Sequence, residues 1–151
     1  MLVAALLWLC SPVEAGAGEA LAGPVRAEVL EVIDGDTIRV GAHIWLGQRV
    51  ITLVRLSGID APELKADCAE ERRLGELARR LLRDRLGEGD VWLTDIEYEK
   101  FAGRVLARVA TADGADLSHG LLQAGLARPY DGGKRASWCP LAAASERVEL
   151  P

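Results

Sequence analysis

The chain has no excess of positive charge. Its 151 residues include 18 Lys and Arg against 23 Asp and Glu, a formal net charge of −5. Binding of nucleic-acid strands through counterion release needs clusters of Lys and Arg. The composition therefore argues against a broad basic surface, and any contact with a strand must be local and assisted by a metal.

Aromatic residues are scarce at 5%, while half of the residues are hydrophobic. This composition favours a compact aliphatic core, and the length predicts one domain large enough to bury it. Internal repeats are absent. The domain is expected to span residues 24–151.

The apolar run at the start of the chain is too short for a membrane span. Glu14 is the only charged side chain before Glu19, and Val13-Glu14-Ala15 has the small-residue pattern of a cleavage site. The pattern predicts a signal peptide over residues 1–15, or up to residue 23, and hence a secreted or periplasmic protein without stable membrane association. The missing basic n-region leaves two alternatives, a start further upstream or an uncleaved anchor.

Cysteine is also rare. Removal of the leader leaves Cys68 and Cys139. Two cysteines in an exported chain predict one disulfide, and the alternative is two unrelated buried thiols. With His43 and His119 as the only other soft ligands, a structural zinc site is not expected.

Several acidic residues stand at predicted strand ends. Asp34-Gly35 is a strong hairpin signal between the β-rich runs Val25 to Ile33 and Thr37 to Val40, so Asp36 begins the returning strand. Residues 41–48 are predicted to form a second turn region, and Arg49 to Ser57 a third strand.

A second group of charges follows this third strand. Asp60 and Glu63 are three residues apart, the span of a β-turn, and Pro62 prevents a helix from running through Ala61. Arg55 lies near the end of the strand and faces two carboxylates. From spacing alone, Arg55 is either their counter-ion or part of a catalytic site.

The remaining chain predicts two helices and two strands. Residues 68–86 have Leu and Ala at helical spacing, and residues 117–124 form a second helix stopped by Gly125. Residues 91–96 and 104–111 are the last two strands. Arginines along the first helix alternate with acidic residues, which favours solvated pairing over a nucleic-acid patch. Five strands with one inserted helix predict an α+β chain folded as a partly open barrel, the OB-fold.

Four ordered blocks carry a family resemblance. They are Asp34 to Thr37 (DGDT), Arg55 to Glu63, Gly103 to Ala107, and Gln123 to Ala127, the last with Ala124 inserted. In this order they resemble the staphylococcal nuclease (thermonuclease) family. The resemblance implies the OB-fold, a five-stranded Greek-key barrel with two to three packed helices.

The resemblance also assigns roles at a metal site. Asp36 and Asp60 are hard oxygen ligands suited to Ca²⁺, and the family implies the backbone carbonyl of Ala61 as a further ligand. Glu63 is expected to take a proton from an attacking water or to orient it, and Arg55 to donate to the substrate phosphate.

Two further residues rest on the resemblance alone. Arg104, in the Gly103 block, is expected to be a second phosphate donor, although Ala102 separates the usual preceding aromatic from Gly103. Tyr130 matches a position where the family stacks a nucleotide base, and its alternative role is packing at the edge of the barrel.

Two functions from different classes remain open. One is a Ca²⁺-dependent exported nuclease that hydrolyses DNA and RNA and, by resemblance, leaves 3′-phosphate ends. The other is a non-catalytic OB-fold module that binds nucleic acid. Retention of the three charged catalytic residues and both metal-ligand carboxylates favours the enzyme, and a monomer is the default.

Overall fold

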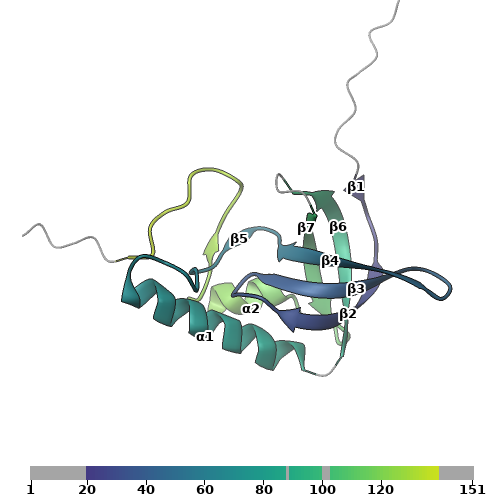
Figure 1. The fold of residues 1–151 in the computed structure, drawn as a ribbon, viewed down its shortest axis with the longest axis horizontal. Helices are drawn as coiled ribbons and strands as arrows, with labels where there is room; N and C mark the ends of the chain where they lie inside the picture. Colours follow the sequence, from purple (N-terminus) through teal and green to yellow (C-terminus); the bar gives the residue numbers. More distant parts are fainter. Residues whose placement is uncertain (1–19, 88, 100–102, 140–151) are drawn as a thin grey trace, which may run out of the picture.

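The computed structural model describes residues 20–87, 89–99 and 103–139, which fold around one β-barrel (Figure 1). The strands are β1 (Ala20–Leu21), β2 (Val25–Val32), β3 (Thr37–Trp45), β4 (Gln48–Leu56), β5 (Ile59–Asp60), β6 (Asp90–Tyr98), β7 (Arg104–Thr111) and β8 (Arg128–Pro129). The helices are α1 (Ala69–Leu86) and α2 (Leu117–Gln123).

Five strands close the barrel. β2, β3 and β4 form an antiparallel meander, β4 pairs in parallel with β7, and β6 closes the circuit by pairing with both β7 and β2. This is the expected OB-fold, with α1 inserted between the meander and the last two strands. The short strands β5 and β8 pair with each other outside the barrel.

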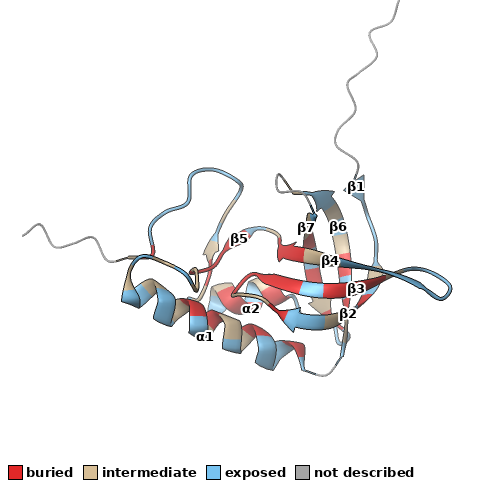
Figure 2. Ribbon diagram, in the orientation of Figure 1, coloured by how far each residue is buried: buried red, intermediate tan, exposed pale blue. Residues whose placement is uncertain are grey.

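The core lies inside the barrel and between the barrel and α1 (Figure 2). Its fully enclosed side chains are aliphatic, as the composition predicts, and include Ile38, Leu56, Leu82, Leu93 and Leu121. Gly75, Ala78, Leu82 and Leu86 form the buried stripe of α1, which continues the helical spacing seen in the sequence. The core thus fixes α1 across the barrel, next to β5.

One predicted turn is wrong. Residues 41–45 continue β3 instead of forming a connection, and the chain reverses at Leu46-Gly47, where Gly47 has a φ of +70°. Gly41 is a strand residue paired with Ile51, and the side chain of Arg49 covers the space where a Cβ would stand. The glycine therefore serves a close approach and not a turn.

The proposed signal peptide at residues 1–15 lies outside the described residues. Ala20–Leu21 pair with Ile96 and Glu97 on β6, so residues just after the proposed leader contact the barrel. None of the helices among residues 20–87, 89–99 and 103–139 is long and apolar enough to cross a bilayer.

Candidate active site

Asp36 is set in place by the turn between β2 and β3. The amide of Asp36 donates to the Asp34 carboxylate at 3.1 Å, and the Asp36 carbonyl accepts from Leu56 N at 2.8 Å, which ties the turn to the end of β4. Gly35 is required here, since a Cβ at this position would lie 2.7 Å from that of Ala78 on α1. The turn formed by the DGDT sequence therefore packs closely on α1, and the Asp36 side chain is buried.

The Asp36 carboxylate is buried and fully hydrogen-bonded. Its Oδ1 accepts from Thr37 Oγ1 at 3.0 Å, and its Oδ2 accepts from the Ala61 amide at 3.1 Å. Burial raises the pKa of Asp36 to about 7, against the opposing effect of the Arg55 charge, and the nearby Asp34 charge raises it further. In the metal-free protein this carboxyl therefore titrates near neutral pH.

Arg55 joins Asp36 to Asp60. Its Nη2 lies 2.9 Å from Asp36 Oδ2 and 3.7 Å from Asp60 Oδ1, and all three side chains are almost entirely buried. Thr37 and Arg55 are directly paired in the β3–β4 ladder, which fixes this register. Of the two carboxylates that the sequence predicts near Arg55, the structure brings Asp60 to it, whereas Glu63 pairs with Arg135 and Asp36 takes its place.

Asp60 is the last residue of the short strand β5, and Ala61 follows it directly. Asp60 is paired with Arg128 on β8, so a segment about seventy residues further along the chain holds β5 at the barrel mouth. The Ala61 amide is used by Asp36, and its carbonyl points to a different partner, Arg135. Asp60 and Ala61 therefore present adjacent oxygens at one edge of the cluster.

Glu63 follows on a loop that packs on α1. Its amide donates to Glu71 Oε1 at 3.2 Å, while 45% of its side chain is exposed. Gly75 permits this packing, because a Cβ there would meet the Pro62 carbonyl and the Glu63 carbonyl group at 3.0 Å. Glu63 thus has a fixed backbone and a side chain open to water.

A residue outside the predicted set, Arg135, also enters the site. Its Nε and Nη1 donate to the carboxylates of Asp60 and Glu63, and its Nη2 donates to the Ala61 carbonyl at 3.0 Å. Burial alone would lower the pKa of Arg135, but Glu63 and Asp60 together raise it. The guanidinium thus stays charged. It binds Asp60 and the Ala61 carbonyl, which are predicted cation ligands, and Glu63, which is the predicted base.

Arg135 belongs to a segment anchored at both ends, residues 131–139, here called the strap. Trp138 is buried within it and donates from Nε1 to Asp60 Oδ2 at 3.0 Å, while the Arg128 guanidinium lies 3.7 Å from the centre of the Trp138 ring. Before the strap, the Tyr130 amide donates to the Gly58 carbonyl at 3.0 Å. The strap is therefore attached to the barrel mouth next to Asp60.

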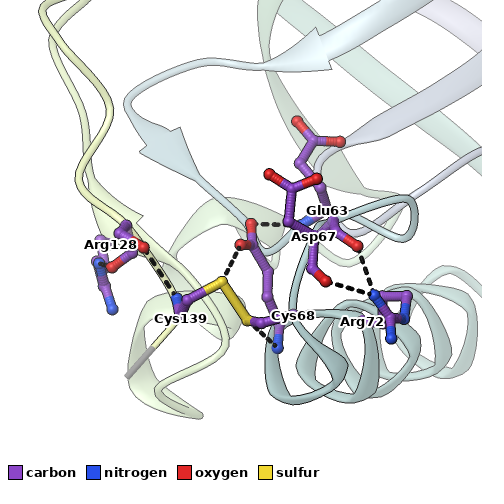
Figure 3. Close-up of a disulfide and its surroundings, with 9 residues drawn as sticks. Glu63, Asp67, Cys68, Arg72, Arg128 and Cys139 are labelled. Atoms are coloured by element: carbon purple, nitrogen blue, oxygen red, sulfur yellow. Dashed lines mark hydrogen bonds between the residues drawn. A yellow bond between two sulfur atoms is a disulfide. The ribbon is translucent and has the colours of Figure 1, made fainter. Parts of the chain in front are cut away.

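A disulfide between Cys68 and Cys139 anchors the far end of the strap to the start of α1 (Figure 3). Cys68 is the N-cap of α1, and its sulfur accepts from the Glu71 amide at 3.4 Å. The Glu71 side chain also lies 3.5 Å from the Cys139 sulfur and accepts from the Glu63 amide. One carboxylate thus contacts both the disulfide and the loop that carries Glu63.

Tyr130 and Arg55 line a common cavity of about 530 Å³. Ile59, Leu106 and Glu99 complete much of its wall. Arg104 lies on β7 opposite Leu53, and its guanidinium donates two hydrogen bonds to Glu99, with Nη2 at 2.8 Å from Oε1. The structure therefore brings Tyr130 to the cavity, and it pairs Arg104 with an acid of the cavity wall.

The oxygens at the barrel mouth suit a hard cation. Asp36, Asp60, Glu63 and the Ala61 carbonyl are all oxygen donors, as Ca²⁺ prefers. A positive group, the Arg135 guanidinium, already lies against three of them, which shows that this pocket of oxygens accommodates positive charge. The donor set therefore fits a divalent cation of the Ca²⁺ class.

Sequence reasoning missed Arg135 and Trp138. A signal did exist, because the predicted pairing of Cys139 with Cys68 places the residues just before Cys139 near the start of α1, beside Glu63. Which of those residues reaches the carboxylates depends on the path of the strap, and no local pattern predicts that path.

The sequence of the chain is similar to those of proteins described as nucleases. Two endonucleases described as uncharacterized, from Escherichia coli and Escherichia coli O157:H7, are each 29% identical to the chain over 111 residues, which is 74% of this chain and 65% of theirs. The chain thus spans about 65% of the length of these relatives. The family model for staphylococcal nuclease homologues matches residues 53–138, more than half of the chain, and the chain belongs to that family.

Proposed function

We propose that the protein is an exported, Ca²⁺-dependent nuclease that hydrolyses phosphodiester bonds of DNA and RNA. The observation that carries the proposal is the Arg55 guanidinium held between the buried carboxylates of Asp36 and Asp60, at the wall of the cavity that Tyr130 also lines. Family membership and the endonuclease name of the two relatives support the same reaction class.

The carboxylates and the Ala61 carbonyl would hold the cation. A bound Ca²⁺ would neutralise charge that develops on the phosphate oxygens. Arg55, Thr37 and the Ala61 amide hold Asp36 in position before substrate arrives, and Arg55 and Trp138 hold Asp60. Such preorganisation lowers the reorganisation that the reaction needs.

Glu63 is the proposed general base. Its half-exposed carboxylate can reach a water, and its backbone is held by Glu71 on one side and Gly75 on the other. Proton removal by a positioned carboxylate contributes about 10²–10⁴-fold to a rate. Arg55 is the proposed donor of a forked pair of hydrogen bonds to the substrate phosphate, a geometry that Lys cannot reproduce.

The cavity supplies the place for a nucleotide. Tyr130 and Leu106 offer apolar surface for a base, and Arg55 marks the end where the phosphate would lie. Arg104 is proposed as a second phosphate donor that exchanges Glu99 for the substrate. By resemblance to the family, the products would carry 3′-phosphate ends.

The test is digestion of single-stranded DNA and RNA by the disulfide-intact chain, with Ca²⁺ or with a chelator, followed by analysis of the ends. We expect cleavage only with Ca²⁺, and a decrease of about 10²–10⁴-fold in Glu63→Gln. Glu70→Gln is the matched control, since it removes the same charge from an exposed position on α1.

Strand binding without cleavage under any divalent cation would reject the nuclease and favour a non-catalytic OB-fold module. Export has its own test. N-terminal sequencing of chain recovered outside the cytoplasm of the producing cell should begin after the proposed leader, and chain found only inside would reject that part of the proposal.

A further inference from the structure

The Arg135 guanidinium contacts three oxygens from the end of β5 and the loop that follows it. These are the Asp60 carboxylate, the Ala61 carbonyl and the Glu63 carboxylate. Two of the three are proposed cation ligands and the third is the proposed base. A cation bound to the same oxygens and Arg135 in its present position would compete for the same lone pairs.

We propose that Arg135 is an internal competitor of the cation and sets the affinity of the site for Ca²⁺. The inference rests on the proposed function, because it takes the cation to bind at Asp60 and Ala61. Its structural basis is independent of catalysis, because the Arg135 guanidinium, which the strap supplies, pairs with the Asp60 and Glu63 carboxylates in the metal-free protein.

The anchoring of the strap makes this competitor permanent. Trp138 bonds Asp60 three residues after Arg135, and Cys139 is fixed to Cys68. Competition is therefore intramolecular, at an effective concentration set by the tether and not by the solution. If the site is free of Arg135 for a tenth of the time, the apparent dissociation constant for the cation rises about tenfold.

Displacement of Arg135 is sterically open, in contrast to displacement of Arg55. The Arg135 side chain is 37% exposed, whereas that of Arg55 is 11% exposed. Arg135 can therefore leave toward solvent without opening the core. A divalent ion also places two positive charges where the guanidinium places one, so the ion is the stronger partner for two carboxylates.

Calorimetric titration of Ca²⁺ into the disulfide-intact chain tests the inference without measuring catalysis. Arg135→Gln removes the charge but keeps most of the side chain. Lys134→Gln is the matched control, because it removes one charge from the neighbouring exposed residue of the strap. We expect Ca²⁺ to bind Arg135→Gln about tenfold more tightly than wild type, and Lys134→Gln to differ by less than about twofold.

A second readout is the rise in Tm caused by saturating Ca²⁺, which should be larger in Arg135→Gln than in either other protein. Equal affinities in the two variants, or weaker binding by Arg135→Gln, would overturn the inference. In that case Ca²⁺-dependent cleavage by the wild type would still support the proposed function. Absence of Ca²⁺ binding in all three proteins would overturn both the inference and the calcium requirement.

Discussion

The two sides of the site differ in how their side chains are held. On one side, here called the buried wall, Asp36, Arg55 and Asp60 have side chains that are at most 11% exposed. On the other, the exposed wall, Glu63 and Arg135 have side chains that are 45% and 37% exposed. The buried wall comes from β4, β5 and the turn before β3, and the exposed wall comes from a loop and the strap.

This difference separates two requirements of the site. Charges in the buried wall have fixed positions. Their removal from water lowers the stability of the folded protein, as the raised pKa of the buried Asp36 carboxyl indicates. Charges in the exposed wall are screened by water and free to exchange partners, which a base and a displaceable competitor need. The contrast predicts that changes to the buried wall lower stability as well as cation binding and rate, while changes to the exposed wall alter cation binding and rate with little loss of stability.

Arg55→Met gives the largest expected loss of stability. It leaves the buried carboxylates of Asp36 and Asp60 without their shared cation, which should lower the free energy of unfolding by about 3–5 kcal/mol in metal-free buffer. Arg39→Met is the control, because it breaks an exposed pair with Glu31 and should cost about 0–1 kcal/mol. Urea unfolding measures both, and equal losses would refute the contrast between the walls.

The raised pKa of Asp36 predicts a pH dependence of the metal-free protein. The pKa is about 7 in the folded chain and 3.8 as its ordinary value, so the folded state binds the proton more tightly. The stability associated with the protonated carboxyl is present below about pH 4 and is lost as the pH rises through 7. Thermal melts without metal should therefore show Tm decreasing between pH 5 and 8.

Asp36→Asn should remove this part of the pH dependence and raise Tm at pH 8 by several degrees. Asp84→Asn, at an exposed position on α1, should retain the wild-type slope. A slope unchanged in Asp36→Asn would mean that another group of the buried wall titrates.

Gly75→Ala gives the smallest change in stability. Alanine favours the helix by about 1 kcal/mol, but its Cβ would press on Pro62 and Glu63 from 3.0 Å, so the two effects should nearly cancel. Displacement of Glu63 by a few tenths of an ångström should still lower the cleavage rate about tenfold. Glu76→Ala, on the exposed side of the same helix, should leave the rate unchanged, and equal rates in both variants would show that this packing does not position Glu63.

Local patterns predict most of the fold and the buried wall. Three elements depend on residues that are close in sequence, and the structure contains all of them. They are the Asp34-Gly35 hairpin, the β-rich strand through Arg55 and the helix predicted from the spacing of residues 68–86. The sequence places Gly41 in a turn because a single strand does not reveal that the side chain of Arg49, on the neighbouring strand, fills the space above it.

The exposed wall is harder to predict because its partners are distant in sequence. Arg135 bonds Asp60 across 75 residues, and no periodicity or short motif reports such a contact. The pairing of Arg104 with Glu99 is close in sequence, and it depends instead on the register of β6 against β7, which has an irregularity between Thr94 and Glu97. The assigned roles of Arg104 and Tyr130 stay predictions.

The late position of the strap in the chain has a consequence for the order in which the site is made. Synthesis proceeds from the N-terminus, so all five barrel strands precede β8, Arg135 and Trp138. During synthesis Asp60 therefore lacks two of its hydrogen-bond partners, Arg135 and Trp138, which lie 75 and 78 residues further along the chain. The newly made barrel would therefore be exposed to divalent ions before Arg135 is present to compete with them.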